Sequence, residues 1–252
     1  DRNYKVGDTK QFKVPSNVSD KGTITAELAK TGENIYLFVA EDSYVKDQDL
    51  EKLVSEFDNK IHPAITNKEN INGKITVLLN QFSDYQMTGY FDPADLYPNL
   101  GNEEPMVYVN ARRNGNINTL LTSTAHQYQH FNFFIDKAKA DRIANDAWVD
   151  QGIAQLSPQL LGYIGPDKKG WSPENGNGWV YNQDFGYLNN TANVNLLVHD
   201  GSLPFTGAAG LFTNYLLDTY GPKLIYSIIT SPKDTQQVIA DYTGTSFNKV
   251  YL

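Results

Sequence analysis

The sequence predicts an α+β fold in two lobes, with a strand-containing lobe over residues 1–140 and a mainly helical lobe over residues 141–252. Strand-like runs surround one amphipathic helix in the first part of the chain, whereas helical periodicity prevails from Asn116 onward. No internal repeat, low-complexity tract or linker divides the chain. We therefore expect residues 1–252 to fold as a single unit.

Four runs are expected to form strands. Residues 23–28 alternate with period two, residues 35–39 are a short apolar run, and the turn sequence at residues 31–34 predicts a hairpin between them. Residues 73–82 have the composition of a buried strand. Residues 106–109 follow a proline and are expected at the edge of the sheet, where an extended peptide could pair with them.

Apolar residues at helical spacing predict the helices. The first is expected over residues 47–61, the second over residues 117–137 and the third over residues 145–154. The third helix contains Trp148 and Gly152, which should let it pack closely against the second.

Single residues mark several helix ends. Asp47 is the expected N-cap of the first helix. Near the C-terminus, residues 235–241 are expected to be helical, Gly244 should end that helix, and a new helix should begin at Ser246. Because this last helix has barely begun at Leu252, we expect the natural protein to continue beyond it.

Composition excludes several function classes. The formal charge of −8 argues against nucleic-acid and anionic-membrane partners, and no apolar run of about 18 residues exists to span a bilayer. The absence of cysteine excludes disulfides, thiolate metal sites and cysteine nucleophiles. A cysteine-free acidic chain that starts at Asp1 is typical of a processed, exported bacterial enzyme, so we expect a secreted, extracellular monomer.

A pair of histidines gives the strongest chemical signal. His126 and His130 are four positions apart on the second predicted helix, so both imidazoles project from one side of it, about one turn apart. Two nitrogen ligands of a single zinc ion need this geometry. The same spacing also occurs among ordinary surface or core histidines, and the surrounding residues decide between the two interpretations.

A helical zinc site that hydrolyses peptides also needs two carboxylates. One directly follows the first histidine and acts as general base on the zinc-bound water, and the other is a third ligand from a following helix. The sequence places Gln127 and Gln151 at these two positions.

Several segments resemble the hyicolysin family of secreted bacterial neutral zinc metallopeptidases. They are residues 126–130 and 148–154, with further likeness at residues 6–10, 57–65, 89–91, 95–99 and 211–221. The resemblance implies a two-lobed, zincin-like metallopeptidase that acts on a protein or peptide. It further implies His126, His130 and position 151 as zinc ligands and position 127 as general base.

Both departures from the family pattern exchange a carboxylate for its isosteric amide. Misassigned glutamates, deliberate inactivation and a true non-catalytic relative all produce this pattern, and we predict glutamate at positions 127 and 151 in the working protein. A genuine Gln127 cannot take a proton from metal-bound water, which lowers hydrolysis by roughly 10²–10⁴. A genuine Gln151 is a neutral, weaker ligand. The alternative function is then a catalytically inactive protein that binds peptides or a partner.

Other polar side chains have two interpretations. His199 could stabilise an oxyanion or lie on the surface, and Asp200 is not expected to orient it, because neighbours on an extended segment point to opposite sides. Tyr181 and Tyr187 are alternatives for the oxyanion role. His62 is expected to cap the C-terminal end of the first helix.

Acidic residues gather in the loop before residues 106–109. They are Asp92, Asp95, Glu103 and Glu104, which could bind calcium or form a solvated acidic loop, and the solvated loop is the stronger interpretation. A Ser-His-Asp triad is not favoured, because no Gly-x-Ser-x-Gly turn occurs.

Overall fold

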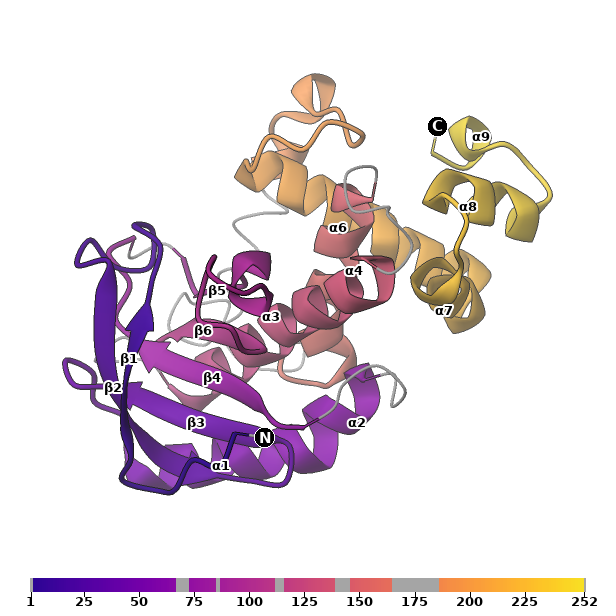
Figure 1. The fold of residues 1–252 in the computed structure, drawn as a ribbon. Helices are drawn as coiled ribbons and strands as arrows, with labels where there is room; N and C mark the ends of the chain where they lie inside the picture. The colour runs from indigo at the N-terminus through magenta and orange to yellow at the C-terminus, as the bar shows by residue number, and fades with distance from the viewer. Residues whose placement is uncertain are drawn as a thin grey trace.

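The computed structural model describes residues 2–66, 73–84, 87–111, 116–138, 146–164 and 186–251. Within these ranges the protein is a mixed α+β structure with a sheet of six strands in the order β1-β2-β3-β4-β6-β5 (Figure 1). The strands are β1 (Thr9–Lys13), β2 (Thr23–Thr31), β3 (Ile35–Ala40), β4 (Ile75–Asn80), β5 (Gly89–Tyr90) and β6 (Met106–Asn110).

The sheet combines an antiparallel half with a parallel centre. β1, β2 and β3 pair antiparallel in sequence, which confirms the predicted hairpin. β3, β4 and β6 run parallel to one another, and the short β5 returns antiparallel along β6. The buried strand predicted over residues 73–82 is confirmed as β4, all of whose side chains are buried.

The prediction of an edge strand at residues 106–109 is wrong. β6 pairs with β4 on one side and with β5 on the other, and each of its five side chains is buried. Pro105 does not force an edge position, because its carbonyl still accepts a bond from the Thr76 amide at 2.9 Å. The short β5 is the edge strand instead.

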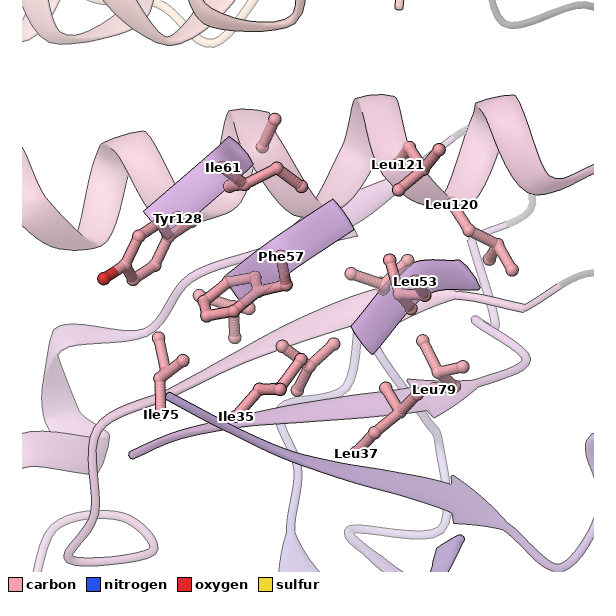
Figure 2. Close-up of a cluster of buried hydrophobic side chains, with 14 of the residues drawn as sticks. Ile35, Leu37, Leu53, Phe57, Ile61, Ile75, Leu79, Leu120, Leu121 and Tyr128 are labelled. Atoms are coloured by element: carbon pink, nitrogen blue, oxygen red, sulfur yellow. The ribbon is translucent and has the colours of Figure 1, made fainter. Parts of the chain in front are cut away.

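Alternation along the central strands divides the core between the two faces of the sheet. Ile35 and Leu37 of β3 belong to the cluster under the helices, whereas Tyr36 and Phe38 belong to the cluster on the opposite face. Figure 2 shows the helical side, where the strand residues Ile35, Leu37, Ile75 and Leu79 face Leu53, Phe57, Ile61, Leu120, Leu121 and Tyr128.

The first helical segment is less regular than predicted. It consists of α1 (Asp47–Glu56), a π-helical stretch (Phe57–Ile61) and α2 (His62–Ile65). The π-helical stretch ends two residues before Pro63, which has no N–H to donate, and the His62 amide bonds to the Phe57 carbonyl at the end of the stretch.

Asp47 does not cap this helix, contrary to the prediction. Lys46 occupies the N-cap position without a side-chain cap bond. The Asp47 carboxylate instead lies 2.7 Å from Nζ of Lys30 on β2, so the ion pair takes the side chain away from the helix amides.

The second helix is confirmed as α3 (Ile117–Ala138), whose apolar side covers the sheet. The remaining helices form a second apolar cluster beyond α3 and away from the sheet (Figure 1). They are α4 (Ala147–Leu160), α6 (Leu203–Tyr220), α7 (Pro222–Thr230), α8 (Thr235–Thr243) and α9 (Phe247–Tyr251), with 3₁₀ turns at Pro93–Leu96 and Thr191–Asn193. Within the described ranges, no helix is long and apolar enough to cross a membrane.

The predicted C-terminal pattern is also confirmed. α8 ends at Gly244, which adopts φ +70 in the left-handed region, and α9 starts shortly after it.

α4 is longer than predicted, and Gly152 on it faces α6 rather than α3. A Cβ added at Gly152 would lie 2.0 Å from Oγ1 of Thr213 on α6. Trp148 likewise packs against Phe212 of α6 and Phe247 of α9. The expected packing of these two residues on the second helix is therefore wrong.

A buried lysine fixes the start of α4. Nζ of Lys137, near the end of α3, contacts the Ile228 carbonyl at 2.8 Å and the Ser231 carbonyl at 3.2 Å, both at the end of α7. The same ammonium lies 3.8 Å from the carboxylate of Asp146, the N-cap residue of α4, and both side chains are only 1% exposed. The Lys137 ammonium therefore links the end of α3, the start of α4 and the end of α7.

Candidate functional site

A pocket of about 680 Å³ lies between α3, α4 and the segment around β5. α3 contributes His126, Gln127 and His130 from the side opposite its sheet-facing residues, and α4 contributes Asp150 and Gln151. The other described lining residues are Asp84, Met87, Thr88, Gly89, Tyr90, Phe91, Pro93, Phe133, Phe134, Ala147, His199, Gly201, Leu203 and Thr206. The structure thus brings the five site residues predicted from the sequence to one pocket: His126, Gln127, His130, Gln151 and His199.

The two imidazoles of α3 converge on one point. Nε2 of His126 lies 3.0 Å from Nε2 of His130, and the ring planes are nearly perpendicular at 82°. Two nitrogens that bind one tetrahedral zinc ion at 2.0–2.1 Å are separated by about 3.3 Å. The observed separation is close to this value.

The His130 imidazole is oriented through its other nitrogen. Its Nδ1 lies 2.9 Å from Oδ1 of Asp150 on α4. An imidazole that donates from Nδ1 presents a lone pair at Nε2, which is the usual arrangement in metal-binding histidines. In this arrangement the lone pair of His130 Nε2 faces Nε2 of His126.

The environment of His126 favours its neutral form. Its side chain is 3% exposed, and burial, followed by the charge of His130, holds its pKa well below the ordinary value of 6.5. A neutral imidazole is the form that binds a metal ion.

Gln127 is held against the edge of the sheet. Its side chain is 6% exposed, and a Cβ added at Gly89 of β5 would lie 2.6 Å from Gln127 Cγ. Glycine at position 89 is therefore what leaves room for this side chain between α3 and β5. Gln151, half-buried on α4, reaches the same pocket.

The donor set fits a zinc ion in part. The two imidazole nitrogens have the required separation and orientation, whereas the third-ligand position holds an amide. Among the residues that the structure describes, no group of three or more His, Cys, Asp or Glu is arranged to hold a metal ion. An amide oxygen can coordinate zinc but does not neutralise its charge, and Gln127 cannot act as a base.

His199 lines the pocket from the segment that precedes α6. Its side chain is exposed, and its ring meets the Phe205 ring edge-on at 4.9 Å. Asp200 accepts a bond from the Ser202 amide at 2.9 Å, which is the main cause of its lowered pKa. Tyr187 packs in the second apolar cluster, and Tyr181 lies outside the described residues.

Two of the four acidic loop residues are buried. Asp95 is 3% exposed and accepts bonds from Tyr108 and Asn102, while burial raises its pKa. Glu104 is 1% exposed and pairs with Lys10 at 2.6 Å and Arg2 at 2.9 Å. The interpretation of a solvated loop is therefore wrong for these two carboxylates, whereas Glu103 is exposed as expected and Asp92 is half-buried.

His62 does not cap a helix end. Its Nδ1 lies 2.7 Å from the Tyr128 hydroxyl, on the side of α3 that faces the core. Burial raises the pKa of Tyr128 to about 12, so the phenol stays protonated and fixes this part of α3. The predicted capping role is wrong, because the ring turns toward α3 instead of the last carbonyls.

Sequence reasoning missed two residues of the site, Asp150 and Gly89. Asp150 directly precedes position 151, but no sequence pattern says which imidazole it bonds. Gly89 belongs to one of the segments that resemble the hyicolysins. The room that it leaves for Gln127 depends on the close approach of α3 to β5.

The chain was compared with known proteins. No protein-family model matches the chain. The chain is similar to the neutral metalloprotease ShpI of Staphylococcus hyicus, with 28% identity over 184 residues that cover 63% of this chain and 41% of that protein. The chain thus spans less than half the length of this relative. The similarity and the mixed α+β architecture make the chain a distant relative of a neutral metalloprotease.

Proposed function

We propose that this chain is a zinc-dependent endopeptidase of the neutral metallopeptidase type. The observation that carries the proposal is the convergence of Nε2 of His126 and Nε2 of His130 at 3.0 Å, with the His130 ring oriented by Asp150 through its other nitrogen. In this proposal His126 and His130 hold the zinc ion, and the side chain at position 151 is the third ligand. The relationship to a neutral metalloprotease supports it.

Each pocket residue has a defined task in this proposal. A zinc ion, when bound, polarises a peptide carbonyl and lowers the pKa of a water molecule. Asp150 holds the His130 ring through a contact of 2.9 Å with Nδ1. His199, which lines the same pocket, is the candidate for hydrogen bonding to the carbonyl oxygen as negative charge develops on it.

The substrate is an extended protein or peptide segment. β5 is the edge of the sheet, has β6 as its strand neighbour and lines the pocket beside Gln127. An extended peptide can add to such an edge by main-chain hydrogen bonds. We place the substrate in the pocket between β5 and the histidines, which both belong to the strand-containing lobe (residues 1–140), with residues of the helical lobe (residues 141–252) lining the same pocket.

The amide at position 127 sets the expected rate. Without a carboxylate to accept the proton, hydrolysis is lower by roughly 10²–10⁴ than with glutamate at this position. Gln127 and Gln151 also favour a second candidate function, a protein that binds peptides or a partner without cleaving them. The extracellular location, the monomeric state and the family assignment to the hyicolysins remain predictions.

A peptidase assay with restored carboxylates separates the two candidates. Zinc-loaded wild type, Gln127→Glu and Gln127→Glu/Gln151→Glu are incubated with a quenched fluorescent casein, with and without a chelator. The endopeptidase proposal expects slow, chelator-sensitive cleavage by wild type and about 10²-fold faster cleavage by Gln127→Glu. Cleavage by the double variant but not by wild type selects the binding protein. Cleavage by neither rules out the peptidase site.

A further inference from the structure

We propose that Met87 is an oxidation site, and that conversion of its thioether to the sulfoxide loosens β5 at the edge of the pocket. The oxidant is a peroxide, which reaches the sulfur through the pocket that Met87 lines. Neither a bound metal ion nor cleavage of a peptide is required, so the site stands apart from the proposed function. The chain thereby gains a reversible modification that acts on one wall of the pocket.

The chain offers a peroxide few targets. It contains two methionines and no cysteine, and thioethers are the sulfur groups that remain for oxidation when thiols are absent. Met106 lies on β6, between β4 and β5, and is completely buried. Met87 is half-buried just before β5 and lines the pocket of about 680 Å³. Met87 is therefore the methionine that a dissolved oxidant can reach.

The surroundings of Met87 provide a partner for the oxidised form. Nδ2 of Asn17 donates to Sδ of Met87 at 3.8 Å, so an amide N–H already points at the sulfur. A thioether sulfur is a weak acceptor, whereas the sulfoxide is polar and carries an oxygen that accepts this N–H. The turn that carries Asn17 is fixed beside the segment before β5, because the Ser83 amide donates to the Val18 carbonyl at 3.1 Å. The donor is thus in place before oxidation.

The modification is a two-electron transfer of oxygen. A lone pair of the sulfur attacks one oxygen of hydrogen peroxide, the S–O bond forms, and the O–O bond breaks. The sulfur is oxidised and the peroxide is reduced. The hydroxide that leaves takes up the proton that remains on the transferred oxygen, which gives water and the neutral sulfoxide. A methionine sulfoxide reductase reverses the change.

Oxidation changes how Met87 packs. The reduced side chain packs against the apolar cluster on the face of the sheet opposite the helices. The polar sulfoxide turns away from that cluster toward Asn17 and water, because an apolar surface offers its oxygen no donor. β5 is two residues long and pairs with β6 through Gly89 and Tyr90, so it depends on the packing of the residue types that lead into it. Loss of that packing loosens the edge strand beside Gln127.

Limited oxidation followed by mass spectrometry tests the inference. The full chain is treated with hydrogen peroxide, and peptide mapping follows the added oxygen atom at each methionine over time. We expect Met87 to be oxidised at least about tenfold faster than Met106. Hydrogen exchange is then compared between the reduced and the singly oxidised protein. Amides of β5 should exchange at least about threefold faster after oxidation, and treatment with the reductase should restore the original rate.

Two leucine variants separate the two methionines. Leucine has nearly the volume of methionine but no sulfur to oxidise. Met87→Leu should keep slow exchange at β5 after peroxide treatment, whereas Met106→Leu, the matched control, should respond as wild type does. Oxidation of Met87 no faster than that of Met106, or unchanged exchange at β5 in the singly oxidised protein, overturns the inference. Faster exchange in peroxide-treated Met87→Leu also overturns it, because another residue then causes the change. None of these results bears on the proposed function.

Discussion

The two sides of α3 follow different physical rules. One side packs Leu120, Leu121, Tyr128 and Phe131 against the sheet, where each side chain is at most 2% exposed. The other side presents His126, Gln127 and His130 to the pocket. On the first side, volume and apolar character decide which residues are tolerated. On the second, a change of one atom, from oxygen to nitrogen, alters the chemistry without altering the packing.

This difference explains why a fold can be kept while its chemistry changes. Glutamine and glutamate have nearly the same size, so exchange at position 127 or 151 leaves the fit of α3, α4 and β5 in place. Substitutions on one side of α3 at a time, with both metal affinity and stability measured, test this difference.

The largest effect is expected from removal of an imidazole on the pocket side. His130→Ala deletes one of two nitrogen ligands and should weaken zinc binding by at least about 10³-fold, or about 4 kcal/mol. Zinc affinity is measured by competition with a chromophoric chelator. His62→Ala is the control, because His62 bonds Tyr128 on the other side of the helix. An unchanged affinity in His130→Ala contradicts the site.

The sheet side should respond in stability alone. Leu121→Ala leaves a cavity between α3 and the sheet and should lower the free energy of unfolding by about 2–5 kcal/mol. Folded Leu121→Ala should bind zinc in the same stoichiometry as wild type. Urea unfolding measures the loss, and Leu160→Ala, at a 68% exposed position on α4, serves as control with little change. Equal losses in the two variants would show that α3 is not packed as described.

A smaller effect is expected from the orienting carboxylate. Asp150→Asn removes the charge beside Nδ1 of His130 while keeping the shape, and should weaken zinc binding by about 10–100-fold. The stability of the metal-free protein should change far less. Asp218→Asn makes the same exchange at an exposed position on α6 and should leave zinc affinity unchanged. If both variants bind zinc as wild type does, Asp150 does not position the ligand.

The smallest effect is a pH dependence of the metal-free chain. Burial, followed by the charge of His130, holds the pKa of His126 well below 6.5. As the pH falls below 6.5, the unfolded chain takes up a proton at His126 that the folded chain does not, so the free energy of unfolding decreases. The decrease is at most about 1.4 kcal/mol per pH unit for this group.

Urea unfolding in a chelator above and below pH 6.5 measures this loss. His126→Gln removes the titrating group and should reduce the difference between the two conditions. If wild type and variant lose the same stability, another group causes the pH dependence.

Periodicity predicted most of the fold, because it reports which side of each element is apolar. The β2–β3 hairpin, β4 and α3 follow from it, and Gly244 marks the end of α8. The neighbours of a strand are not encoded in its own pattern, which is why β6 was expected at the edge. Asp95 and Glu104 were expected in solvent for the same reason: Glu104, for example, is paired by Arg2 and Lys10 from the start of the chain.

The candidate site was predictable as a set of residues but not as a set of bonds. The spacing of His126 and His130 on a helix and the position of Gln151 on the next one place them at one pocket. The bond that Asp150 accepts from His130 and the contact of Gln127 with Gly89 depend on how α4 and β5 approach α3. These distances are set by tertiary packing, so no local pattern reports them.

A zinc-edge anomalous difference map from crystals grown with zinc tests the central claim most directly. The account predicts one peak at about 2.0–2.1 Å from Nε2 of His126 and Nε2 of His130, with the side chain at position 151 turned toward it. The map should lose this peak in His130→Ala crystals grown under the same conditions. A wild-type map without a peak between the two imidazoles, or with the imidazoles turned apart, would contradict the account.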